Sequence, residues 1–257
     1  MNPGDAKKRV VAIEAESRAE PGEGGFLTLV RMHDRNRYED GSLSRPYVYE
    51  YIRRRGFDAV AIAIFHETQG LPMMAYRQGI RVPVYFRKAL PLTLPDGRDY
   101  LFTPEAVAGS LEPVDRGVEG FLRRVVDEVW EEAGFRIVPQ DVLPLGGGFF
   151  PSHGQSSEKI HLCAVRVDPE TREAAPGDGS VNERDAGQAK FRPVADILLD
   201  CARGAIEDPK IEILCRRLSL KLRYLPELRR YAAGGDGNGP AEFLQALEEG
   251  AGFSSGR

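Results

Sequence analysis

Apolar residues recur at i, i+3, i+4 and i+7 spacing between positions 118 and 133, which predicts an amphipathic helix. The stripe consists of Val118, Phe121, Leu122, Val125, Val126, Val129, Trp130 and Ala133. Gly134 follows the last of these residues, where a helix that ends in a left-handed conformation favours glycine. The pattern therefore fixes both the buried face of this helix and its end.

Shorter apolar runs predict the strands of a sheet. Residues 59–65 read Ala-Val-Ala-Ile-Ala-Ile-Phe, a run typical of a strand that is buried on both faces. Further strands are predicted at 71–76, 84–86 and 159–167, and further helices within 191–203, at 206–224 and at 240–249. Mixed strands with helices on both sides favour an α/β fold, an α/β/α sandwich with a mixed sheet.

The chain divides into four predicted segments. Residues 26–57 contain short β-like runs broken by Asp40-Gly41, a hairpin signal. This small N-terminal antiparallel β segment has too little apolar mass to stand alone, so we expect it to pack on the main domain or on a second subunit. The other segments are a flexible N-terminus at 1–25, the main domain at 58–231 and a flexible tail at 232–257.

Composition narrows the class of protein. The 257 residues suffice for one large or two small domains, and 42% apolar with 29% charged residues is ordinary for a soluble globular protein. With a net charge of −4, the protein has no overall positive field that would attract nucleic acid or an anionic membrane. Because Cys163, Cys201 and Cys215 form no Cys-x-x-Cys pair, and the apolar runs match neither a membrane span nor a signal peptide, we expect a cytoplasmic protein.

Three glutamates mark the candidate chemistry. Glu128, Glu131 and Glu132 share one side of the predicted helix, at the shoulder of its apolar stripe. Like charges at this spacing repel by a few tenths of a kcal/mol, and carboxylates beside a buried face lose solvation. A cation between them would relieve both costs, and Mg²⁺ (or Mn²⁺) prefers carboxylate oxygens with phosphates as co-ligands. An ordinary solvated helix end is the alternative interpretation.

The same stretch resembles the signature of the Nudix hydrolases, which runs Gly, then Glu, then Arg-Glu-apolar-x-Glu-Glu-x-Gly-apolar. The matching residues are Gly109, Glu119, Glu128, Val129, Glu131, Glu132, Gly134 and Phe135. Two departures stand out: four additional residues separate Gly109 from Glu119, and Asp127 replaces the Arg that orients the glutamates in the family. Arg123 and Arg124, one turn earlier, are the candidates to restore charge balance.

Other segments resemble the ADP-ribose and nucleotide-sugar pyrophosphatase branch of this family. They are 36–42, 47–50, 55–61, Ala75-Tyr76-Arg77-Gln78, Phe150 to Glu158 and Gly204 to Lys210, within a likeness that covers most of 26–225. The resemblance implies Mg²⁺-dependent hydrolysis of the pyrophosphate bond of ADP-ribose or a related nucleoside diphosphate sugar. The products would be a nucleoside monophosphate and a sugar phosphate, and the N-terminal segment would exchange across a homodimer.

The resemblance also implies roles for individual residues. The metal ligands would be Glu128, Glu131, Glu132 and the backbone carbonyl of Ala108, with Gly109 allowing close approach of the chain to the metal. Glu131 and Glu132 would serve catalysis together with a base on a later loop, where Glu183 is the first choice and Asp185 the second. An ordinary solvated loop glutamate is the alternative for Glu183.

Substrate contacts are implied for four further residues. Arg77 and Arg55 would bind the diphosphate, with a register uncertain by one residue within 53–55. Tyr49 would stack on the base and Glu50 would accept hydrogen bonds from it, although Tyr49 also fits an ordinary strand aromatic. Glu158 would face the metal, or else lie at the surface where a strand starts.

Two function classes remain open at this point. One is a pyrophosphatase, which the retained glutamates and Gly134 favour. The other is a Nudix-fold nucleotide-binding or regulatory module with little or no turnover, which Asp127 and the lengthened Gly109–Glu119 connection favour.

Overall fold

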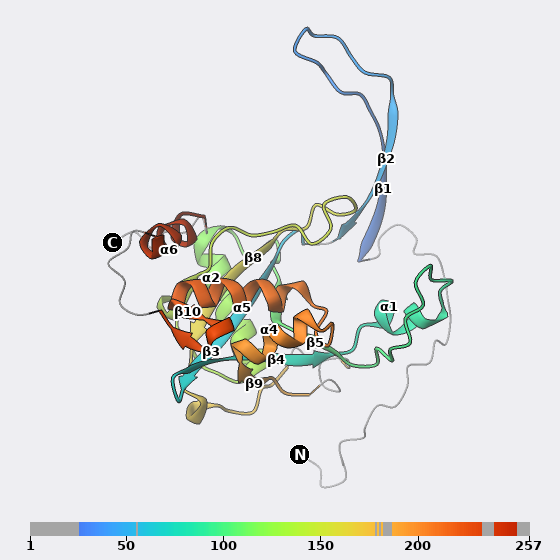
Figure 1. The fold of residues 1–257 in the computed structure, drawn as a ribbon. Coiled ribbons are helices and arrows are strands. Elements are labelled where there is room, and N and C mark those ends of the chain that lie inside the picture. Colours follow the sequence, from blue (N-terminus) through green and yellow to red (C-terminus); the bar gives the residue numbers. More distant parts are fainter. Residues whose placement is uncertain are drawn as a thin grey trace.

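A mixed sheet of seven strands forms the centre of the molecule in this computed structural model (Figure 1). The structure describes residues 26–54, 56–177, 179, 181, 187–232 and 239–250. The strand order is β5-β4-β3-β8-β7, with β6 paired to β3 and β9 paired to β4. These strands are β3 Ala59–Thr68, β4 Leu71–Gly79, β5 Thr103–Glu105, β6 Val107–Ser110, β7 Val142–Pro144, β8 Ile160–Arg166 and β9 Lys190–Pro193. Only β3 and β8 pair in parallel; the other pairs in this sheet are antiparallel.

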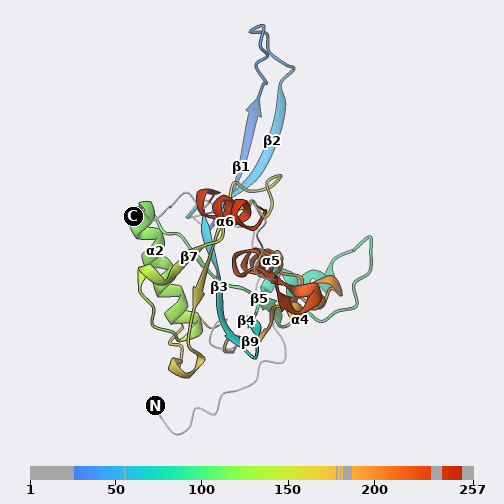
Figure 2. The same cartoon turned by 60° about the vertical axis from the view of Figure 1, so that its left-hand side comes forward.

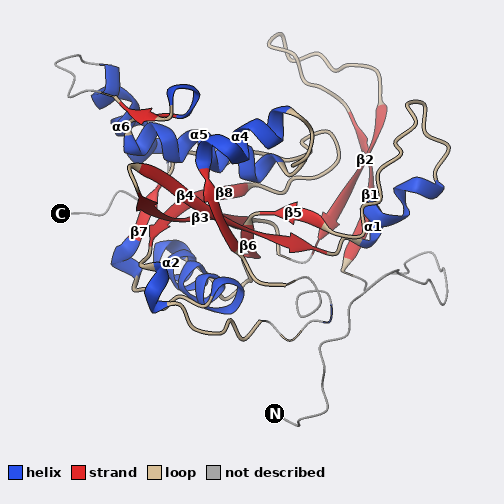
Figure 3. Cartoon of the chain, turned by 60° about the horizontal axis from the view of Figure 1, so that its bottom comes forward, coloured by secondary structure: helices blue, strands red, loops and turns tan. Residues whose placement is uncertain are grey.

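Helices cover both faces of this sheet, with α2 on one side and α4 and α5 on the other (Figures 2 and 3). The described α-helices are α1 Val82–Tyr85, α2 Gly117–Glu128, α4 Val194–Ala202, α5 Pro209–Leu222 and α6 Gly239–Gly250. Single 3₁₀ turns occur at Phe86–Ala89, Pro139–Asp141, Pro169–Thr171 and Pro226–Leu228, and a small ribbon pairs β10 Tyr224–Leu225 with β11 Arg230–Tyr231. The predicted α/β/α sandwich is confirmed.

The central strand β3 contributes to two separate cores because successive side chains point to opposite faces. Val60, Ile62 and Ile64 pack with Phe121 and Val125 of α2. The alternate residues of β3 pack with α4 and α5; this second core includes Ala61, Ala63, Phe65, Ile197, Ile211, Leu214 and Leu218. The continuous apolar run seen in the sequence therefore reflects a strand buried on both faces.

The helix that carries the glutamates ends as predicted. After Glu128 it widens into a single π-helical turn, Val129–Ala133, and Gly134 then closes it with a φ of 76°. A Cβ at Gly134 would overlap the carbonyl oxygen of Glu173, so glycine is required there for space as well as for backbone conformation. A π-turn places Glu131 and Glu132 on a locally irregular segment, a feature often found at functional sites.

The N-terminal β segment is a hairpin that stands away from the domain (Figure 1). Its strands, β1 Leu27–Asp34 and β2 Tyr47–Arg54, pair antiparallel, and Gly41 has a φ of 82° in the connection between them. Ile52 joins the hairpin to the domain, because its amide donates a 2.7 Å hydrogen bond to the carbonyl of Gln155. The predicted separate antiparallel segment is confirmed.

Two sequence assignments need correction. The strand predicted at 84–86 is instead α1 and a 3₁₀ turn, since Pro83 fits the first turn of a helix and removes a strand donor. The helix predicted at 206–224 begins only at Pro209, because the side chain of Asp208 caps it by accepting from the Lys210 amide. The helix predicted at 240–249, in contrast, is confirmed as α6, and its Leu247 is buried.

Candidate active site

A cavity of about 510 Å³ lies beside the glutamate-bearing helix, at the end of the sheet where β6 and β8 meet α5. We call it the glutamate cavity. Its described lining includes five carboxylate side chains and four cationic ones, which are Glu112, Glu128, Glu131, Glu132 and Glu158 with Arg54, Arg81, Arg124 and Lys210. Ala108 and Gly109 of β6 form part of its wall. The three predicted metal ligands with side chains therefore meet in one cavity.

Glu132 is held by a buried ion pair. Arg77 of β4 donates a 2.7 Å hydrogen bond to one of its oxygens, and both side chains are only 7% exposed. The Ala108 amide donates to the other oxygen at 3.2 Å. Arg77 does not belong to the described lining of the cavity. Arg77 therefore positions Glu132 in this structure, and its contact with a diphosphate stays a prediction.

Glu128 packs against β6 at Gly109. A Cβ at Gly109 would overlap the Glu128 carboxylate, so only glycine allows this helix residue to lie against the strand. Glu128 is 9% exposed, and its nearer oxygen is 3.8 Å from the guanidinium of Arg124. Gly109 is thus needed for the close approach of the Glu128 carboxylate, and the close approach to a metal that the resemblance implies stays a prediction.

Asp115 holds the arginine beside Glu128. Its carboxylate accepts from Arg124 at 3.0 Å and from Arg123 at 3.2 Å, and its side chain is 2% exposed. Burial alone would raise the pKa of Asp115, but the Glu112 amide and the two guanidinium groups outweigh it and lower that pKa. Asp115 lies in the lengthened Gly109–Glu119 connection, so one departure from the Nudix signature supplies the group that anchors Arg124.

The arginine from 53–55 that lines the cavity is Arg54, whereas Arg55 lies outside the described residues. Arg54 ends β2 and forms a 2.8 Å ion pair with Glu158. It also donates to the Ser110 hydroxyl at 3.2 Å and to the Asp58 carbonyl at 3.1 Å. Glu158, predicted either to face the metal or to lie at the surface, lines the cavity.

Other predicted residues lie elsewhere. Tyr49 and Glu50 are on the exposed hairpin, where the Tyr49 hydroxyl donates to the Gly154 carbonyl at 3.0 Å and Glu50 pairs with Arg31 at 2.5 Å. Neither belongs to the described lining of the glutamate cavity. The two candidate bases, Glu183 and Asp185, lie outside the described residues.

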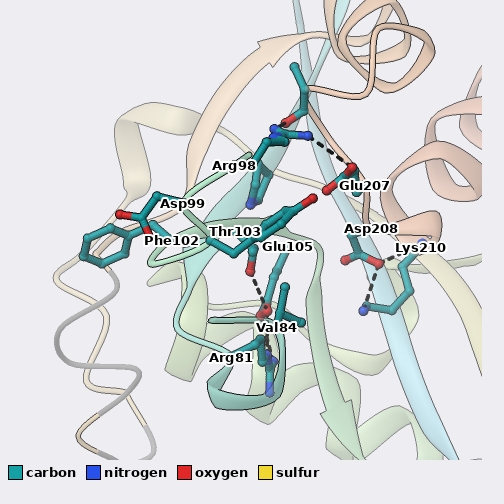
Figure 4. Close-up of a pocket in the computed structure, with 13 residues that line it drawn as sticks. Arg81, Val84, Arg98, Asp99, Phe102, Thr103, Glu105, Glu207, Asp208 and Lys210 are labelled. Carbon is teal, nitrogen blue, oxygen red and sulfur yellow. Dashed lines mark hydrogen bonds and ion pairs between the residues drawn. The ribbon is translucent and has the colours of Figure 1, made fainter. Parts of the chain in front are cut away.

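The sequence analysis missed a second cavity, of about 280 Å³, which shares Arg81 and Lys210 with the first (Figure 4). Glu105, a buried residue of β5, accepts two hydrogen bonds from Arg81, at 2.5 and 2.7 Å. These bonds raise the pKa of Arg81, so its guanidinium stays charged. The one signal of this cavity in the sequence is Glu105, a single glutamate shortly before the apolar start of β6. Single glutamates of this kind are too common for one to be singled out.

The residues present fit a hard divalent cation that takes some of its ligands from the protein and the others from a substrate. In the part of the chain that the structure describes, no group of three His, Cys, Asp or Glu side chains forms a ready-made metal site. Mg²⁺ commonly keeps its waters and uses one or two carboxylates plus substrate phosphates. Glu128 and Glu132, tightly placed by Gly109 and Arg77, match that smaller requirement.

No family model matches the chain, and no curated protein matches it. The likeness to the Nudix signature therefore rests on the residues themselves. None of the described helices is long and apolar enough to cross a membrane.

Proposed function

We propose that this chain is a Nudix-type pyrophosphatase. It would hydrolyse the pyrophosphate bond of ADP-ribose or a related nucleoside diphosphate sugar, releasing a nucleoside monophosphate and a sugar phosphate. The observation that carries the proposal is the convergence of Glu128, Glu131 and Glu132 in one cavity with four cationic side chains. Such a mixture suits a metal ion and a diphosphate bound together.

Glu128, Glu131, Glu132 and the carbonyl of Ala108 are the proposed ligands of Mg²⁺, or of Mn²⁺ in its place. The bound ion supplies positive charge for the diphosphate and lowers the pKa of water. Arg77 fixes the orientation of Glu132 through their buried pair. Glu131 and Glu132 are the proposed catalytic carboxylates of the helix, with Glu183 as the loop base and Asp185 as its alternative.

Arg54, Arg81 and Lys210 are the proposed contacts to the diphosphate, because all three line the glutamate cavity. Guanidinium groups bind phosphate oxygens in pairs, whereas a lysine acts as a point charge. Arg54 takes the role that the resemblance implied for Arg55, one residue away within the uncertain register.

We further propose a homodimer that completes the substrate site. The hairpin exposes large apolar side chains on both strands, including Leu29 at 68%, Val48 at 54% and Tyr49 at 43%. Exposed apolar surface of this kind marks an interaction site. A second copy seated on the hairpin would bring Tyr49 and Glu50 to the nucleotide end of a shared pocket. The free thiols Cys163, Cys201 and Cys215 agree with the cytoplasmic location proposed from the sequence.

A nucleotide-binding or regulatory module is the second candidate. The observation that favours it is the position of Arg124, a fixed cation 3.8 Å from Glu128 that offsets part of the acidic charge without a metal ion. In that case the cavity would hold a nucleotide without turnover.

A substrate panel separates these two candidates. ADP-ribose and nucleotide sugars with different bases and sugars are incubated with the purified protein, with Mg²⁺ or with EDTA, and the products are resolved by ion-exchange chromatography. The pyrophosphatase predicts Mg²⁺-dependent release of nucleoside monophosphate from at least one compound. Tight binding without product across the panel would support the binding module instead.

A further inference from the structure

The second cavity is built by two segments that are far apart in the sequence (Figure 4). One is the connection between β4 and β5, residues 80–102, and the other is the loop that leads into α5. We call it the insert cavity. Its described lining consists of Arg81, Val84, Arg98, Asp99, Tyr100, Phe102, Thr103, Pro104, Glu105, Ala205, Glu207, Asp208 and Lys210.

Asp208 joins this cavity to the glutamate cavity. Its carboxylate accepts from the Ala106 amide at 3.0 Å, between β5 and β6, and from the Lys210 amide at 3.0 Å. It also pairs with the Lys210 ammonium at 3.0 Å. The β5–β6 segment therefore has Glu105 in one cavity and Gly109 in the other, with Arg81 and Lys210 lining both.

The charges of the insert cavity are balanced within the protein. Arg98 pairs with Glu207 at 3.2 Å, Arg81 with Glu105 at 2.5 Å, and Lys210 with Asp208. Counting Asp99 as well, the described lining has three cations and four carboxylates. Arg81 and Lys210 lie where the two cavities join; away from them the charged side chains are Arg98, Asp99 and Glu207, which are net negative and would repel a second phosphate there. A neutral ligand with several hydroxyl groups fits, because each hydroxyl can donate to a carboxylate and accept from a guanidinium.

The size of the cavity points to part of a ligand. At about 280 Å³ it falls just below the range of about 300–1,000 Å³ that is typical of pockets for whole small molecules. The adjoining glutamate cavity offers room for the remainder, and two cationic side chains line both spaces. One ligand can thus extend from one cavity into the other.

We propose that the insert cavity is the sugar subsite of the enzyme and selects the sugar of the nucleoside diphosphate sugar; this inference rests on the proposed function. Glu207 and Arg98 form hydrogen bonds with sugar hydroxyls at its outer end. Arg81 and Lys210 contact the phosphate that carries the sugar, where the two cavities join. A site built to hydrogen-bond a hydroxyl discriminates strongly against compounds that lack it.

The test compares ADP-ribose with the β-methyl ester of ADP, which keeps the nucleoside and the diphosphate but has no sugar. In Glu207→Ala the ratio of kcat/KM for ADP-ribose to that for the ester should fall at least about tenfold, because a charge-assisted hydrogen bond is lost. Glu207 is half exposed in a surface ion pair, which contributes little to stability, so this variant should fold. Glu227→Ala, which breaks a similar exposed pair with Arg216 outside the cavity, should leave the ratio unchanged. An unchanged ratio in Glu207→Ala overturns the proposal.

Calorimetric binding of the same two compounds separates this proposal from the proposed function. If the wild type binds ADP-ribose without hydrolysing it, the enzyme proposal fails, and a tenfold selective loss of ADP-ribose affinity in Glu207→Ala still supports the sugar subsite. If Glu207→Ala instead changes the preference between ADP-ribose and a nucleotide sugar with another base but the same sugar, the cavity binds the base and the sugar assignment is wrong. Failure of the wild type to bind either compound rejects both proposals.

Discussion

The guanidinium of Arg124 lies 3.8 Å from the carboxylate of Glu128, one helical turn away. Asp115 fixes it there by accepting a 3.0 Å hydrogen bond from the same side chain. In the Nudix signature an arginine directly precedes the first helix glutamate, whereas this chain has Asp127 at that place. The chain therefore supplies the neighbouring positive charge from a different position, through a carboxylate in its lengthened connection.

This arrangement predicts the outcome of Asp127→Arg. Because Arg124 already lies beside Glu128, a second arginine should give no gain in Mg²⁺ affinity or rate, and any change should stay within about threefold, as for a single exposed helix charge pair. Steady-state rates over a Mg²⁺ titration provide the measurement. A clear increase would instead mean that Asp127 weakens the site.

Removing the charge of Asp115 should produce a pH-dependent loss of stability. The pKa of Asp115 in the folded protein lies below its ordinary value of 3.8, so the ionised carboxylate stabilises the fold above that pH and the contribution is lost as the pH falls through the lowered pKa. Asp115→Asn should cost about 2 kcal/mol at neutral pH. Urea unfolding at several pH values should show the wild type and the variant converging below pH 3.8. A difference independent of pH would contradict the assigned role of the charge.

Glu128→Gln and Glu132→Gln should both remove activity but differ in stability. Each should lower kcat at least about a hundredfold, comparable to the loss of one major electrostatic group. Glu132→Gln also breaks the buried pair with Arg77, so it should destabilise the protein by about 3–5 kcal/mol, while Glu128→Gln, whose ion pair with Arg124 is longer at 3.8 Å, should destabilise it less. Glu173→Gln, at an exposed pair with Arg136, is the matched control for both measurements. Full turnover in Glu128→Gln would remove it from the metal site.

The hairpin should mediate dimer formation. Leu29→Glu places a charge at a strand residue that is 68% exposed in the single chain, and it should yield a monomer with weakened substrate binding. Leu228→Glu is the control, because Leu228 is 58% exposed but lies in the 3₁₀ turn Pro226–Leu228 and not in the hairpin. This variant should leave the dimer intact. Light scattering at the assay concentration measures both. If the wild type is a monomer with full activity, then the dimer proposal is wrong and Tyr49 and Glu50 are ordinary strand residues.

Local patterns in the sequence predicted much of the fold. Three of its predictions are found: the apolar period of α2, the apolar run of β3 and the helix end at Gly134. Each depends only on residues that are close together in the sequence, within one helix or strand. Strand β9 was missed because its four residues are only partly apolar and become a strand only by pairing with β4.

The candidate site was predictable only where one helix carries it. The grouping of Glu128, Glu131 and Glu132 follows from helical spacing alone. The buried role of Arg77, the anchoring of Arg124 by Asp115 and the insert cavity all depend on segments that meet only in the folded chain. Arg54 illustrates the same limit, since a shift of one residue on a strand exchanges the faces to which side chains point.

The most direct test of the account is ³¹P NMR of a nucleoside diphosphate sugar incubated with the protein in water enriched in ¹⁸O. With Mg²⁺ present, the account predicts that the two diphosphate signals are replaced by two phosphomonoester signals, one of them shifted by ¹⁸O, and that EDTA or Glu128→Gln prevents this change. Diphosphate signals that broaden on binding but persist in Mg²⁺, across the substrate panel, would contradict it.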